Sequence, residues 1–72
     1  MFRGHNPYRE ARREVREVLG YARTWLTVSQ FAKVSGYLPE LVESWCASGR
    51  LPAQATEDGT YLINYRYLVG LR

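Results

Sequence analysis

The first apolar pattern along the chain is helical. From Tyr8 the apolar residues recur in steps of three and four, while Arg and Glu fill most of the positions between them. This stripe consists of Tyr8, Ala11, Val15, Val18 and Ala22. Asn6 can cap the free amides of a first turn, and Pro7 suits the first helical position. The pattern predicts an amphipathic helix from Pro7 to Leu19, and a continuation through Gly20 would cost about 1 kcal/mol.

Two shorter helices are predicted next. Thr27 and Gln30 have the spacing of a capping box, and the helix that they begin ends at the C-terminal glycine Gly36. Pro39 opens another helix, which ends at Gly49. We expect Phe31 and Trp45 to be core residues and Cys46 to be a small buried hydrophobic residue.

A hairpin follows the two short helices. Asp58-Gly59 is a strong turn signal between a segment at 54–56 and the β-prone residues 61–63, and Asn64 can cap a last short helix through Leu71. Two short helices joined by a glycine-containing turn indicate a helix-turn-helix, and a following hairpin makes it winged. The expected fold is therefore mainly α with a small β-hairpin. A winged helix-turn-helix of residues 25–72 is preceded by the amphipathic helix within residues 1–24.

Composition narrows the class of protein. Seventy-two residues, of which 46% are hydrophobic, are enough for one small folded domain. One cysteine and one histidine allow neither an internal disulfide nor a Cys/His zinc site, and a single free thiol suits a reducing cytoplasm. We see no apolar run of about 20 residues and no apolar core of a secretory signal, so we expect no membrane span. The expectation is a cytoplasmic protein without a cofactor.

Positive charge is concentrated in the N-terminal third. Residues 1–24 hold six arginines against three glutamates, whereas residues 25–72 hold four basic and four acidic residues. The arginine-rich helix has three possible roles: a solvated helix that docks on the domain, a source of phosphate contacts, or an arm for a partner protein or for self-association. Its small apolar face lacks central Trp, Phe or Leu anchors, which argues against a membrane surface.

The segment from Leu26 to Ala53 resembles the DNA-binding domain shared by phage excisionases and MerR-type regulators. The matching positions are Leu26, Thr27, Val28, Ala32, Gly36, Pro39, Val42, Trp45, Ser48, Gly49, Arg50, Leu51, Pro52 and Ala53, and the match continues through Asp58-Gly59 to Ile63 and Leu68. The resemblance implies that the helix opened by Pro39 enters the major groove and that the hairpin tip touches the adjacent backbone or minor groove.

This chain departs from the family on that reading face. Relatives commonly carry arginines on the exposed side of the second short helix and in the wing. Here those places hold Glu40, Glu43, Ser44 and Ala47 in the helix, and Glu57 and Asp58 in the wing. Leu38 stands where a capping Ser is common. Several carboxylates beside phosphates are repulsive, so the usual reading face has lost its positive charge.

Two functions remain. The first is a small DNA-binding accessory or regulatory protein in transcription or phage-type recombination, which binds duplex DNA and recruits a recombinase or polymerase. The second is a protein-binding module that reuses the winged scaffold to dock on an enzyme or RNA polymerase. An enzyme is not expected, because the chain offers no supported pair of carboxylates, phosphate-binding glycine loop or metal cluster. The candidate DNA contacts are Arg9, Arg12, Arg13, Arg16, Lys33, Glu40, Glu43, Ser44, Arg50 and Thr60.

Overall fold

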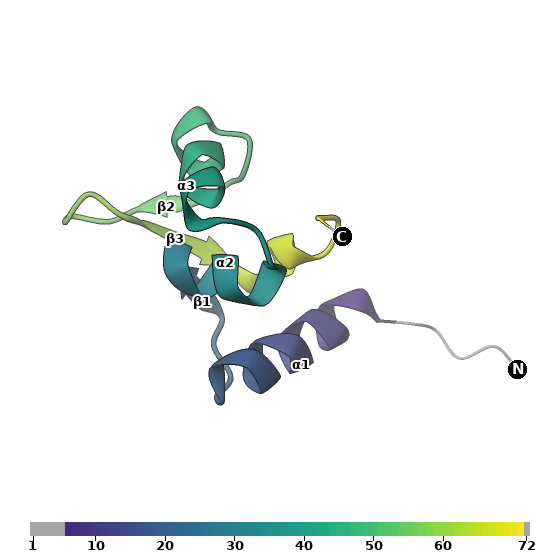
Figure 1. Cartoon of the computed structure of the whole chain (residues 1–72). Coiled ribbons are helices and arrows are strands. Elements are labelled where there is room, and N and C mark those ends of the chain that lie inside the picture. The colour runs from purple at the N-terminus through teal and green to yellow at the C-terminus, as the bar shows by residue number, and fades with distance from the viewer. Residues whose placement is uncertain (1–5, 72) are drawn as a thin grey trace, which may run out of the picture.

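The protein is mainly helical, with three α-helices and a small three-stranded antiparallel sheet (Figure 1). The computed structural model describes residues 6–71, so Arg3, His5 and Arg72 lie outside the described residues. The elements are α1 (Pro7–Leu19), β1 (Trp25–Thr27), α2 (Val28–Ser35), α3 (Pro39–Ser48), β2 (Gln54–Ala55), β3 (Tyr61–Asn64) and a 3-10 helix, η1 (Tyr65–Leu68). Figure 1 shows α2 between α3 and α1, with the β2–β3 hairpin projecting to one side.

The helix ends confirm the capping predictions. The Asn6 side chain accepts hydrogen bonds from the amides of Tyr8 and Arg9, at 3.0 and 3.2 Å. Thr27 and Gln30 form the reciprocal capping box at the start of α2, with bonds of 3.1 and 3.0 Å. Gly36 ends α2 in the left-handed conformation, with φ of 86°. These ends depend on side chains within a few residues of each other, which makes them readable from sequence.

The sheet contains one strand more than the predicted hairpin. The β2–β3 hairpin forms around the Asp58-Gly59 turn as expected, and β1 adds to the other side of β3 in the order β1-β3-β2. Leu26 of β1 lies opposite Ile63 of β3, and both side chains are fully buried. A strand of three residues carries too little alternation to be recognised, and its partner lies far along the chain.

Strand β1 has a free edge on which two of the outward backbone groups are already bonded to side chains. The Tyr65 amide donates to the Thr24 carbonyl at 2.9 Å, so the alternation of an antiparallel ladder turns the backbone groups of Trp25 and Thr27 away from β3. The Trp25 carbonyl accepts from the Arg23 side chain, and the Thr27 amide donates to the Gln30 side chain. These local bonds occupy groups that another strand would need.

The core lies between the sheet, α2 and the two flanking helices. Its largest fully buried side chains are Phe31, Leu26, Ile63, Val15 and Val42. Cys46 is also buried, as predicted. Trp45 differs from its prediction as a core residue: it is only partly buried and packs against the edge of the core.

The predicted stripe of α1 is buried only at its centre. Ala11 and Val15 belong to the core, whereas Tyr8 and Val18 remain 47% and 42% exposed. Ala22 follows the end of the helix and is exposed. Helix α1 packs against α2 and the short η1, which cover only the centre of its apolar face.

The C-terminal segment is shorter in helix than predicted. Asn64 caps it, accepting from the Arg66 amide at 3.0 Å, but it forms a single 3-10 turn that ends at Leu68 rather than a helix through Leu71. The Tyr37 hydroxyl donates to the Leu71 carbonyl at 2.6 Å and ties this end to the α2–α3 turn. Among residues 6–71, no helix is long and apolar enough to cross a membrane.

Candidate nucleic-acid interface

Helix α1 separates its charged side chains into two sectors. Successive residues of an α-helix are rotated by about 100°. In α1 this rotation gathers the four arginines on one side, while Glu10, Glu14 and Glu17 lie together on another. The arginines of this sector are Arg9, Arg12, Arg13 and Arg16, and all four are exposed. The structure thus gathers four of the ten sequence candidates on one continuous face.

The 3-10 helix η1 adds to this face where it meets α1. The Arg12 guanidinium lies over the Tyr65 ring, 5.5 Å from its centre. The Arg66 guanidinium lies over the Tyr8 ring at 5.7 Å. Beside these pairs is a hollow of about 290 Å³, which is also lined by Arg9. A cation over an aromatic ring is attracted by the electron-rich face of the ring, which holds the side chain in place.

Acidic side chains occupy a different surface, around α3 and the hairpin. Helix α3 and residues 54–64 contain no Lys or Arg, and they carry Glu40, Glu43, Glu57 and Asp58, all exposed. A groove of about 450 Å³ runs between the start of α2, the start of α3 and the hairpin. Glu43 and Asp58 line it together with the apolar Val28, Pro39 and Tyr61. The expected reading face is therefore an acidic groove with an apolar floor.

The hairpin tip holds one of these carboxylates ionised. Asp58 accepts hydrogen bonds from the hydroxyls of Thr56 and Thr60, and the Thr60 bond measures 2.9 Å. These bonds, that from Thr56 foremost, hold the pKa of Asp58 below its ordinary value. The hydroxyl of Thr60, a predicted DNA contact, is thus engaged within the turn.

A second carboxylate affects the only thiol. Burial raises the pKa of Cys46, and the nearby charge of Glu43 raises it further. A thiol with a raised pKa is a poor nucleophile at neutral pH, because the reactive form is the thiolate. This environment favours a packing role for Cys46 rather than a chemical one.

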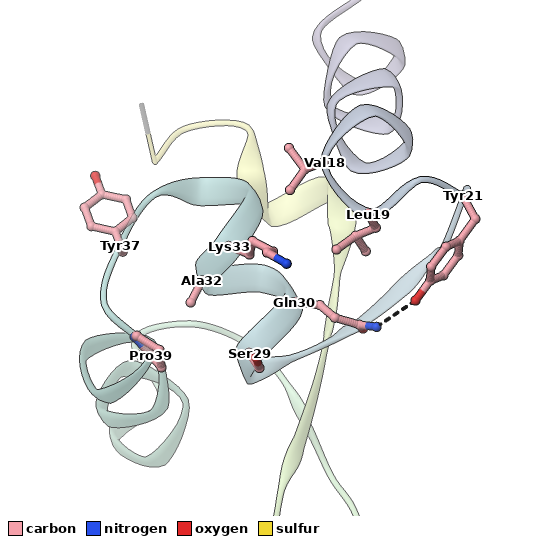
Figure 2. Close-up of a pocket in the computed structure, with 9 residues that line it drawn as sticks. All are labelled: Val18, Leu19, Tyr21, Ser29, Gln30, Ala32, Lys33, Tyr37 and Pro39. Atoms are coloured by element: carbon pink, nitrogen blue, oxygen red, sulfur yellow. Dashed lines mark hydrogen bonds between the residues drawn. The ribbon is translucent and has the colours of Figure 1, made fainter.

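The remaining candidates do not join the arginine face. Lys33 is exposed on α2 and lines a hollow of about 490 Å³ between α2, the end of α1 and the α2–α3 turn. Figure 2 shows Lys33 on α2, with Tyr37 and Pro39 on one side and Val18 and Leu19 on the other. Beside Leu19, the Gln30 side chain donates to the Tyr21 hydroxyl at 3.1 Å. Arg50 follows α3 and is exposed beside Trp45 and Leu51, whereas Ser44 is exposed on α3 itself.

Sequence reasoning missed Arg66 and the two tyrosines that hold the arginines. Arg66 falls within a C-terminal part whose charges sum to zero. Their meeting with Arg12 and Tyr8 depends on how η1 docks on α1, and no short motif encodes this contact. The spacing of Tyr8 and Arg12, four residues apart, shows only that they share one face of the helix.

Potential metal-ligating side chains do not cluster within residues 6–71. Among the described residues, no group of three or more His, Cys, Asp or Glu side chains could hold a metal ion. The geometry instead offers two charged surfaces of opposite sign, on either side of α2.

Comparison with known proteins adds no relative: no family model, no curated protein and no solved structure matches this chain.

Proposed function

We propose that this chain is a small DNA-binding accessory or regulatory protein of the excisionase or MerR-like type. In this proposal α2, α3 and the β2–β3 hairpin form a winged helix-turn-helix. The order of these elements and the glycine turn at Gly36 support it, together with the resemblance between Leu26 and Ala53. The protein binds duplex DNA without chemistry of its own and brings a recombinase or polymerase to the site.

One observation carries the proposal: positive charge is gathered on a single exposed face. The four arginines of α1 stand in one sector, and Arg66 extends that face from a distant part of the sequence. Nonspecific affinity for duplex DNA comes from basic side chains that replace the counterions of phosphates. The acidic groove repels phosphates, so we assign the main backbone contacts to α1 rather than to α3.

A salt titration tests the proposal. We expect the full chain to bind a random-sequence duplex at low salt, with an affinity that falls steeply as salt rises. The slope of log K against log salt grows by about 0.9 for each phosphate that the protein neutralises. If the protein fails to bind duplex DNA even at low salt, DNA binding is excluded as its function.

The acidic groove favours a second candidate, a protein-binding module. Glu43 and Asp58 line a groove with an apolar floor, and neither α3 nor the hairpin carries a compensating cation. Such a groove suits a basic segment of a polymerase or recombinase subunit. Both candidates are compatible in one molecule, since α2 separates the two surfaces (Figure 1). Binding of a recombinase or polymerase subunit that is abolished in Glu43→Arg but kept in Arg13→Ala would support this second role.

A further inference from the structure

At the junction of α1 and η1, each element supplies one tyrosine whose ring contacts an arginine of the other element. Helix α1 supplies Tyr8 and Arg12, and η1 supplies the consecutive residues Tyr65 and Arg66. Each arginine lies over the tyrosine of the other element, at 5.5 and 5.7 Å from the ring centre. Both guanidinium groups therefore have defined positions, although both residues are exposed.

A guanidinium held over a ring keeps its hydrogen-bonding capacity. Its five N–H donors lie in the plane of the group and point outward from its edges, so the contact of one face with an aromatic ring leaves them free to meet an anion. A planar donor fork matches two phosphate oxygens at once. Less rotational freedom is lost on binding when the fork is already in place.

The surroundings of the junction have the charge that a phosphate needs. Arg9 and Arg12 line the hollow of about 290 Å³ beside the two pairs, together with Asn6, Tyr8 and Tyr65. Among the described residues, the side chains that line it include no carboxylate, since the glutamates of α1 lie in another sector of the helix. Two arginines of α1 thus line the hollow, and Arg66 of η1 adjoins it through its contact with the Tyr8 ring.

We propose that this hollow, together with Arg66 on the adjoining Tyr8 ring, is a phosphate-binding site for the backbone of a nucleic acid. Arg12 and Arg66 supply the donor forks, Tyr65 and Tyr8 hold them, and Arg9 provides the third positive charge. The inference rests on the proposed function and assigns its anchoring contact to a composite site. That site requires η1 as well as α1, so the helix alone is not the complete phosphate-binding surface.

The test compares single variants of equal charge in the full chain. Arg66→Gln removes a proposed contact. Arg50→Gln serves as the matched control, because Arg50 is also exposed but lies beside Trp45 and Leu51, outside the arginine face. We expect Arg66→Gln to lower the log–log salt slope for duplex DNA by about 0.9, and Arg50→Gln to leave it unchanged. Thermal melting of each variant confirms that the domain is still folded.

Two further variants distinguish the effect of a guanidinium held in position from the effect of its charge alone. Arg66→Lys keeps the charge but lacks the planar fork, and Tyr8→Leu keeps all charges but removes the ring beneath Arg66. We expect both to weaken duplex binding at low salt. Full affinity in both variants would show that Arg66 acts only through its charge, and that result would overturn the site.

The outcomes also distinguish this site from the proposed function. Wild-type binding with an unchanged slope in Arg66→Gln would overturn the composite site and leave DNA binding intact. A lowered slope in Arg50→Gln alone would move the phosphate contacts to the end of α3. A wild-type protein that binds no duplex at low salt would overturn the site and the proposed function together.

Discussion

Tyr37 and Trp45 meet edge to face, with ring centroids 5.2 Å apart and ring planes inclined by 70°. This pair joins the α2–α3 turn to α3, and the Tyr37 hydroxyl also binds the Leu71 carbonyl. Tyr37 thus links α3, the turn and the C-terminal segment, and its partner Trp45 is only partly buried. Phe31, by contrast, is fully buried at the centre of the molecule.

This difference predicts an order of stability losses. Phe31→Ala should lower the free energy of unfolding by about 3–5 kcal/mol, because it removes a large side chain from a closed core. Trp45→Ala should cost less, below about 3 kcal/mol, because part of the indole already faces water. Chemical denaturation of both variants measures the order. The total stability is about 5 kcal/mol, so a folded Phe31→Ala beside an unfolded Trp45→Ala would contradict a core centred on Phe31.

The arginine sector of α1 predicts a uniform loss of DNA affinity. Arg13→Ala combined with Arg16→Ala should weaken binding to all duplex sequences alike and lower the salt slope by about 0.9 for each phosphate that is no longer neutralised. Thermal stability should change little, because both side chains are exposed. Lys33→Ala with Arg50→Ala removes the same charge elsewhere and provides the control. Equal reductions in the two double variants would mean that only net charge matters.

The acidic face of α3 predicts opposite effects on two ligands. Glu40→Arg with Glu43→Arg changes the net charge by about +4 at the proposed reading face. Duplex affinity should rise if phosphates approach that face, whereas affinity for a basic protein partner should fall. Glu10→Arg with Glu17→Arg makes the same change in charge on α1, away from α3 and the hairpin. If neither ligand responds to the α3 variant, this helix is not a contact surface.

The Asp58 turn predicts a pH dependence of the hairpin. Its pKa is lowered in the folded state by bonds from Thr56 and Thr60. Between that lowered value and the ordinary one, the unfolded chain binds a proton that the folded chain does not. The stability from these bonds is therefore present above the ordinary pKa and is lost as pH falls through the lowered value. Acid titration by NMR, read at the Thr60 amide, should show this, and Thr56→Val should raise the pKa of Asp58.

We expect the buried thiol of Cys46 to react slowly with thiol reagents. Cys46 should react with a disulfide reagent much more slowly in the folded protein than in the denatured chain at the same pH, because burial, and then Glu43, raises its pKa. Glu43→Gln should speed the reaction modestly, since burial is the larger cause. Equal rates for folded and denatured protein would show that the thiol is open to solvent.

Local signals explain what could be predicted about the fold. Asn6, the Thr27–Gln30 capping box and Gly36 set helix ends through contacts within one turn, and the bounds of these helices were predicted correctly. Strand β1 was missed because only its pairing with β3 makes it a strand. Trp45 was placed too deep, because its position relative to the surface depends on how α3 docks.

The candidate site was predictable in its charge but not in its assembly. The four arginines of α1 follow from the charge pattern, and their shared face follows from helical rotation. The contribution of Arg66 could not be predicted in this way. The charges of residues 25–72 sum to zero, and this sum does not reveal that folding brings Arg66 next to α1. The sequence predicted that α3 and the hairpin lack positive charge. It did not predict the apolar floor of the groove, because that floor depends on how α2 packs near the hairpin.

The bonded edge of β1 limits the ways in which copies of this protein can join. An open strand edge invites continuous pairing between molecules, the route to domain swapping and fibrous aggregates. Here the side chains of Arg23 and Gln30 already bond the Trp25 carbonyl and the Thr27 amide that a neighbouring chain would seek. Sheet extension at β1 is therefore obstructed. Crowding of many copies should not by itself promote fibre formation through this edge.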